Sequence, residues 1–144
     1  MSFMNECDAA LYTKLRASTA LTALTSGGTA DPQVWRALAP QGTTSPYVVF
    51  APQSPSTPRR VMAGVAYESA LYTVKAVVES PSASLAGTMA GHIDTALDGP
   101  SLTFTSYTHM RCTRIQDIDY TELAADGTRY QHRGAIYRVE ADPN

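Results

Sequence analysis

The side chains that could perform chemistry are scattered through this 144-residue chain, and no spacing groups them into a catalytic motif. His92, His109 and His132 do not stand at metal-ligand spacing with Cys7 or Cys112, whereas a zinc site uses paired ligands such as C-x-x-C. No serine lies in the G-x-S-x-G turn that presents a hydrolase nucleophile. We therefore predict no metal site, no catalytic residue and no cofactor, and hence a protein that is not an enzyme.

One acidic cluster and the thiol of Cys7 have side chains that could bind a cation or act as a nucleophile. The cluster Asp117, Asp119, Glu122 and Asp126 could form a divalent-cation loop, but it lacks the D-x-D-x-D-G pattern with its distal Glu. We interpret it as a solvated edge or an interface loop. A thiolate at Cys7 would be stabilised at a helix start, yet a partly buried thiol in a reducing cytoplasm is the interpretation we favour.

Composition bounds the class of protein. A net charge of −2 and a pI near 5.8 argue against a dedicated nucleic-acid binder, which usually carries a basic excess. The hydrophobic fraction of 44% suffices for one core. No apolar run approaches the ~20 residues needed to cross a bilayer, and no secretory signal is evident. We expect a single domain, residues 1–144, without a membrane partner and folded in the cytoplasm.

Two helices are expected from capping and periodicity. Asn5 can cap a first helix, whose apolar stripe changes phase near Ser18, where a second short piece could begin. A later helix is capped by Ser82 or Ser84, carries apolar residues every fourth position and stops at Gly99-Pro100. On this helix, Gly87 and Gly91 form a G-x-x-x-G pattern that would let a strand or a neighbouring subunit approach closely.

The strands are expected at 34–39, 47–50, 67–79, 102–119 and 130–141. The clearest, 67–79, alternates at period two and turns Thr73 and Lys75 toward water or a polar partner. Strand 102–119 has an irregular alternation around Arg111 and Arg114, which a bulge or a partner on its second face would explain. Asp126-Gly127 predicts the turn into the last strand.

Between the second and third of these strands lies a segment with three prolines, Pro52, Pro55 and Pro58. This spacing excludes a central strand or a helix. We predict an extended, exposed loop or arm over 51–66. Its Arg59-Arg60 pair could contact phosphates or a partner's carboxylates, or could be a solvated loop end.

The element order is helix, two or three strands, helix, two strands. Because helices and strands do not alternate strictly, a doubly wound fold fits poorly. We predict the α+β class, with an antiparallel or mixed sheet of about four or five strands packed with two main helices.

The order of short motifs along the chain carries a family resemblance. They are Ala10-Leu11-Tyr12-x-x-Leu15, Pro46–Phe50, a long strand ending near Val78, Ile93-x-x-Ala96-Leu97, and the Asp126-Gly127 turn before Tyr130-x-His132-Arg133-Gly134 and Tyr137-Arg138-Val139. This order resembles the tail-terminator, or tail-completion, proteins of long-tailed, siphovirus-type bacteriophages. Two features depart from the family pattern: Asp31–Trp35 replaces a Gly-Arg-Val/Ile-Tyr-like segment, and the arm is long.

The resemblance implies a ring, usually a hexamer, at the head-proximal end of the tail tube. Such a ring stops tube polymerisation, and its implied partners are copies of itself, the major tail tube protein and the head completion or connector protein. DNA would pass through the lumen without specific binding, which suits an acidic protein. The implied location is the tail or neck of the virion, after assembly in the host cytoplasm. The alternatives are another neck subunit or a small bacterial ligand-binding α+β domain.

A closed ring needs two different surface patches that meet around the axis. The candidates are side chains of the arm, of the polar face of strand 67–79 and of the irregular strand 107–119. They are Arg59, Arg60, Thr73, Lys75, Arg111, Arg114, Asp117 and Asp119.

Overall fold

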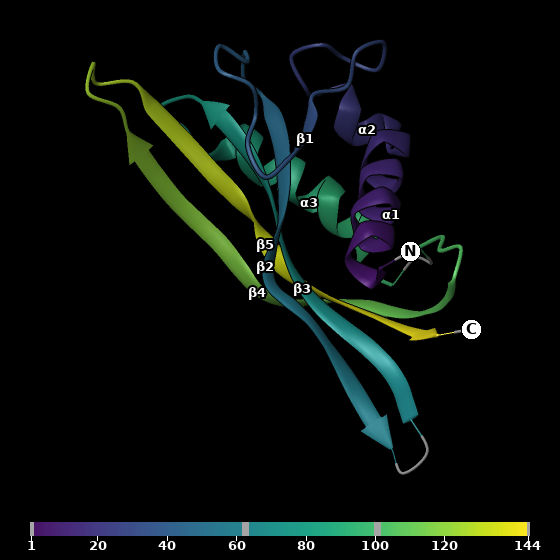
Figure 1. The fold of residues 1–144 in the computed structure, drawn as a ribbon. Coiled ribbons are helices and arrows are strands. Elements are labelled where there is room, and N and C mark those ends of the chain that lie inside the picture. The colour runs from purple at the N-terminus through teal and green to yellow at the C-terminus, as the bar shows by residue number, and fades with distance from the viewer. Residues whose placement is uncertain (1, 62–63, 100–101, 144) are drawn as a thin grey trace.

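A five-stranded sheet with helices packed on one face forms the molecule (Figure 1). The computed structural model describes residues 2–61, 64–99 and 102–143. In chain order the elements are α1 (Phe3–Ala17), α2 (Thr19–Thr22), β1 (Val34–Arg36), β2 (Tyr47–Val61), β3 (Gly64–Glu79), α3 (Ser84–Leu97), β4 (Tyr107–Leu123) and β5 (Arg129–Pro143). The predicted α+β class is confirmed, with α1 and α3 as its main helices.

The strand order is β1-β2-β3-β5-β4, so the last strand in sequence lies inside the sheet. β1 runs parallel to β2, and the other neighbours are antiparallel, which makes the sheet mixed as predicted. The two edges differ: β4 is a 17-residue strand, whereas β1 covers only three positions of β2.

Local capping sets the helix boundaries. α1 begins before the predicted cap, because Ser2 is its N-cap and accepts a 3.3 Å hydrogen bond from the Asn5 N–H. The predicted break at Ser18 is confirmed, and its side chain accepts from the Leu21 N–H at 3.4 Å. Neither predicted serine caps α3, whose N-cap position is Ala83. Pro100 lies outside the described residues.

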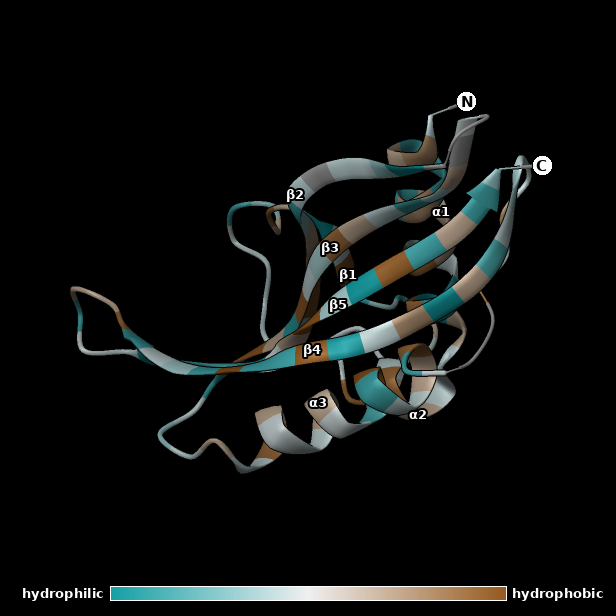
Figure 2. Cartoon of the chain, turned by 90° about the horizontal axis from the view of Figure 1, so that it is seen from below, coloured by the Kyte–Doolittle hydropathy of each residue, from teal (hydrophilic) through white to brown (hydrophobic). Residues whose placement is uncertain are grey.

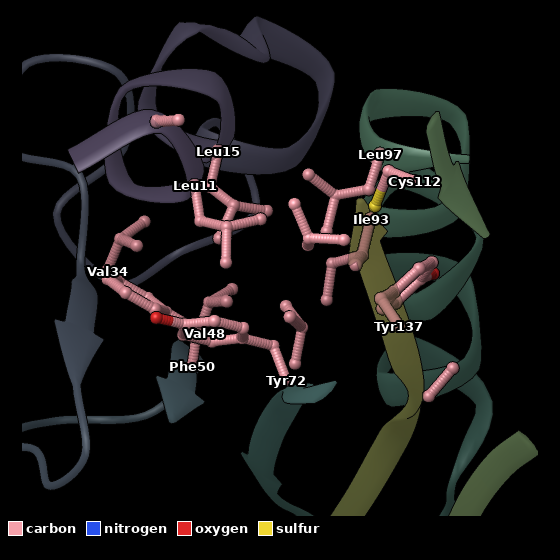
Figure 3. Packing of buried hydrophobic residues seen from close by; sticks show 14 of the residues in the cluster. Leu11, Leu15, Val34, Val48, Phe50, Tyr72, Ile93, Leu97, Cys112 and Tyr137 are labelled. Atoms are coloured by element: carbon pink, nitrogen blue, oxygen red, sulfur yellow. The ribbon is translucent and has the colours of Figure 1, made fainter. Parts of the chain in front are cut away.

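The core lies between α1, α3 and one face of the sheet (Figure 3). Leu11 and Leu15 of α1 lie near Val48 and Phe50 of β2 in this view. Burying each such side chain stabilises the fold by about 1.5–3 kcal/mol. The predicted period-two faces are confirmed as buried: they contain Ala70, Tyr72, Val74, Ala76 and Val78 of β3, and Ala135, Tyr137, Val139 and Ala141 of β5. Hydrophobic and hydrophilic residues accordingly alternate along β5 (Figure 2).

The proline-rich segment is a strand rather than the predicted loop. β2 continues through it to Val61, paired with β3, with register shifts between Pro52 and Ser54 and between Ser54 and Thr57. Since β1 pairs only as far as Phe50, the later part of β2 is an edge strand, where proline is tolerated. Figure 1 shows β2 and β3 extending together as a projecting hairpin. Of the predicted 51–66 segment, residues 62–63 lie outside the described residues.

Two other strand predictions need correction. β1 ends at Arg36 instead of position 39, because Ala37 has a positive φ of 66° that breaks the extended backbone. β4 starts at Tyr107 rather than 102 and runs on to Leu123. Its irregular alternation comes from register shifts between His109 and Arg111 and between Arg114 and Gln116. Of the two explanations that the sequence allowed, a bulge is therefore present, and it occurs at two places in β4.

Candidate interaction surfaces

The residues predicted for interfaces lie on three separate parts of the molecule. Arg59 and Arg60 lie near the end of the β2–β3 hairpin. Arg114, Asp117 and Asp119 line a groove between α3 and the sheet. Thr73, Lys75 and Arg111 interact on the opposite face of the sheet, which we call the helix-free face.

The α3–β4 groove, defined by these two elements and the neighbouring part of β5, has a volume of about 370 Å³. Its α3 wall is formed by the small residues Gly87, Ala90 and Gly91, and by Asp94. A Cβ at Gly87 would stand 3.0 Å from Nη1 of Arg133, so this glycine lets the arginine lie against the helix. A Cβ at Gly91 would meet nothing within 4 Å. In the G-x-x-x-G pattern, Gly87 thus allows Arg133 to approach the helix closely, whereas Gly91 leaves open space.

Opposite charges pair with one another along the lining of the groove. Arg133 donates to both carboxylate oxygens of Asp119, each at 3.1 Å. Arg114 lies 3.7 Å from Asp94 and 3.6 Å from Asp117. The side chains of Asp117 and Asp119 remain 72% and 60% exposed. Ion pairs this exposed contribute about 0–1 kcal/mol each, so they can exchange partners with an incoming charged group at little cost.

Asp94 anchors the groove to the core. It accepts a 3.0 Å hydrogen bond from the hydroxyl of Tyr137, a buried residue of β5. Burial and the nearby Asp94 carboxylate raise the pKa of Tyr137, which keeps the phenol protonated as a donor. Sequence reasoning missed Asp94 and Arg133 as groove residues. The signal for Asp94 was its spacing of three and seven residues from Gly91 and Gly87, which places all three on one helix face.

On the helix-free face, a series of side chains in contact with one another extends across β3, β4 and β5. Lys75 donates from Nζ to the Tyr120 hydroxyl at 2.6 Å. The Tyr120 ring stacks on His132 with centroids 4.3 Å apart, and Nε2 of His132 lies 2.8 Å from Oε1 of Glu122. Burial lowers the pKa of His132 despite the Glu122 carboxylate, so the imidazole is neutral at neutral pH. Lys75 is thus already engaged within the subunit.

The remaining predicted residues of this face also have intramolecular partners. Arg111 donates to Glu140 at 2.6 Å, and the Glu140 side chain is only 5% exposed. Removing Arg111 would leave a buried carboxylate without its counter-charge, so the first role of this arginine is structural. Thr73 donates to Oε1 of Gln53 on the neighbouring strand at 3.2 Å.

The predicted acidic cluster does not form a cation loop. Asp117 and Asp119 line the groove, whereas Glu122 contacts His132 on the helix-free face. Asp126 stabilises the hairpin turn by accepting from the Thr128 N–H at 2.9 Å. Among the described residues, no His, Cys, Asp and Glu side chains gather in a group that could hold a metal ion. Within the same part of the chain, no helix has the length and apolar character required to span a bilayer.

Both cysteines are free and buried in the core. Burial raises the pKa of Cys112 to about 12 and raises that of Cys7 as well. The alternative of a reactive thiolate at Cys7 therefore has no support, and both groups are thiols at neutral pH.

The hairpin that carries Arg59 and Arg60 has different surroundings. β5 pairs with β3 only from Glu68 onward, so positions 59–61 and 64–67 pair with each other alone. We call this segment the arm. Both arginines are exposed, and no described carboxylate lies within ion-pair distance of either. Their charges are available to another molecule.

The fold is thus a one-sided α+β sheet with open, charged surfaces. Comparison with protein families identifies the chain further: the family described as "Tail completion protein gp17" matches residues 9–140. The chain belongs to this family, and is therefore a structural protein of the phage tail and a component of the virion. The predicted resemblance is confirmed.

A solved structure shows the same fold. One chain of the structure titled "Virion of native gene transfer agent (GTA) particle" is similar over 98% of this chain and 99% of its own length, with a TM-score of 0.72 and 18% sequence identity. At this identity the similarity shows the fold alone. A comparison with curated proteins found no match.

Proposed function

We propose that copies of this protein form a ring, with six as the expected number, at the head-proximal end of the tail tube. The ring ends tube polymerisation and joins the tail to the connector of the head. Membership of the tail completion family supports the place of the protein in the tail. The observation that carries the ring is the difference between the two sides of the sheet: one ends in β4 and the groove, the other in β1 and the arm.

Two unlike sides favour a head-to-tail assembly. Identical patches pair around a twofold axis and give a dimer, whereas unlike patches repeat around one axis and close into a ring when the rotation allows it. In such a ring every copy uses both of its sides. The two flat sides of the ring then differ from each other, so one can meet the major tail tube protein and the other the head completion or connector protein.

The electrostatics suit a channel for DNA. The chain carries 11 basic and 13 acidic residues, and a protein without a basic excess makes few lasting phosphate contacts. DNA would therefore pass through the lumen without specific binding. The same charge balance gives no reason to expect that the protein binds DNA outside the particle.

Size-exclusion chromatography with light scattering, followed by electron microscopy of the peak, tests the ring. We expect a higher oligomer with a central hole at high protein concentration or on the ends of purified tail tubes. A protein that stays monomeric in both settings would overturn the proposal. The second candidate function is that of another neck subunit. Gene order distinguishes the two, since a terminator gene should lie just upstream of the major tail protein gene.

A further inference from the structure

We propose that the arm of one copy docks in the α3–β4 groove of the next, where Arg59 and Arg60 pair with Asp117 and Asp119. This inference rests on the proposed ring and states which surfaces form its subunit contact. The groove is thus occupied by a second copy of this chain, which inserts its arm.

Within its own subunit the arm is a two-stranded hairpin. A two-stranded hairpin without a third strand or a helix against it is marginally stable in water. Beyond Glu68 the arm has lost its β5 neighbour, and its strands project away from the helices in Figure 1. A contact from another subunit would supply the third surface that the arm lacks within its own chain.

The arm is suited to contact through side chains rather than through its backbone. Directly before the arm, β2 carries Pro52, Pro55 and Pro58, which have no N–H to donate to another strand. Prolines on an edge strand prevent sheet-to-sheet pairing between copies. Among the described side chains near the end of the arm, Arg59 and Arg60 present exposed guanidinium groups that can bind strongly.

The groove has the complementary chemistry. It presents the three carboxylates of Asp94, Asp117 and Asp119 against the two guanidinium groups of Arg114 and Arg133, and so has one negative charge in excess. Arginine forms two-pronged pairs with carboxylates, which fix the orientation of a docked segment.

The shape of the groove also permits entry of the arm. Its α3 wall has no large side chain where Gly87, Ala90 and Gly91 lie, and the space beyond Gly91 is empty for at least 4 Å. An incoming arginine can therefore reach the exposed carboxylates of Asp117 and Asp119 past the helix. The arm and the groove are two different patches, so their contact can repeat head-to-tail around one axis, as a ring requires.

Chemical crosslinking tests the contact directly. The variant Ala66→Cys/Gly91→Cys places one thiol on the arm, at a residue outside the proposed ion pairs, and one in the groove, and Gly91 accepts a side chain without a clash. The natural thiols, Cys7 and Cys112, are buried and should not react. We expect a short bismaleimide to give a ladder of covalent dimers and higher species. The control Ala66→Cys/Ala23→Cys, whose second thiol replaces an exposed residue outside the groove lining, should give none.

The outcomes separate this inference from the proposed function. The sample can contain oligomers by light scattering and still show no more crosslinking than the control. This result would overturn arm-to-groove docking, but the proposal of a ring would stand. Crosslinking of the arm to added tube or connector protein instead would show that the arm serves those partners. Absence of any oligomer, alone or on tube ends, would overturn both proposals.

Charge reversal provides a second measurement. Asp117 is the suitable groove residue because its own pair with Arg114 is long, at 3.6 Å, so the fold should tolerate its replacement. Arg60→Asp and Asp117→Arg should each weaken association about tenfold. The combined variant carries both reversals in every copy and should recover most of the loss. Unchanged association in both single variants would contradict the pairing.

Discussion

Glu6, in the first turn of α1, accepts hydrogen bonds from the backbone N–H of Ser106, which lies 100 residues later in the chain, at 3.1 and 3.0 Å. The same carboxylate accepts from the Thr105 N–H at 2.9 Å. It therefore ties the start of α1 to the segment that leads into β4. Burial raises the pKa of Glu6, but the hydrogen bonds from Ser106 and Thr105 outweigh it and hold the pKa below its ordinary value.

Replacing this carboxylate should destabilise the fold in a pH-dependent way. A group whose pKa is lower in the folded state stabilises that state above its ordinary pKa, and the contribution is lost as the pH falls through the folded value. We expect Glu6→Gln to melt at a lower temperature than the unchanged protein at neutral pH. The gap should shrink in acid, below the ordinary value of 4.5. Thermal melts across this range check it, and a gap independent of pH would contradict the role of the charge.

Val74→Asp should unfold the subunit. Val74 is fully buried in the centre of β3, facing the helices. A buried charge without a partner costs about 3–5 kcal/mol, a large share of the roughly 5–15 kcal/mol that stabilises a typical domain. The control Thr73→Asp places the same side chain on the helix-free face and should stay folded. Solubility and circular dichroism check both, and a soluble, assembly-competent Val74→Asp protein would show that the faces are reversed.

The features that were predicted correctly from the sequence depend only on residues close together in the chain. The period-two alternation of β3 placed Val74 in the core, and the Ser18 cap placed the break between α1 and α2, because both depend on local geometry. The Gly127 turn, with a φ of 87°, was predictable for the same reason.

Features that depend on distant segments were not predictable. Whether the Pro52–Pro58 segment is a loop or a strand depends on where β1 ends, and β1 lies elsewhere in the sequence. The groove depends on the exact register of β4 against β5, which its two bulges shift. Sequence reasoning named Asp117, Asp119 and Arg114 as candidates for an interface, and all three lie in the groove. It placed Arg111 with them, although this arginine serves the buried Glu140.

Two glycines should respond in opposite ways to replacement by alanine. A Cβ at Gly134 would lie 2.0 Å from the carbonyl oxygen of Val74 and 2.5 Å from Cα of Lys75, both backbone atoms that cannot turn away. Gly134→Ala should therefore lower the free energy of unfolding by about 1–3 kcal/mol. Gly91, in the exposed interior of α3, has room, and Gly91→Ala should raise that free energy by up to about 1 kcal/mol. Urea denaturation measures both, and a neutral Gly134→Ala would show that β3 and β5 can separate locally.

Reversing the charge of the arm should impair assembly without affecting the fold. Arg59 and Arg60 are exposed and make no ion pair with a described carboxylate, so Arg59→Glu/Arg60→Glu removes no contact of the subunit. Surface changes of this kind usually alter stability by less than about 0.5 kcal/mol. In a ring, however, the new carboxylates would meet Asp117 and Asp119, and like charges repel.

The measurement combines a thermal melt with complementation of a phage that lacks the gene. We expect an unchanged melting temperature and a fall in joined head–tail particles, with free heads and free tails accumulating. Arg129→Glu is the matched control, since Arg129 is exposed and lies at the β4–β5 hairpin, away from the arm. It should give normal particles. A normal yield from the arm variant would show that neither the ring nor the joining of head and tail depends on the arginines of the arm.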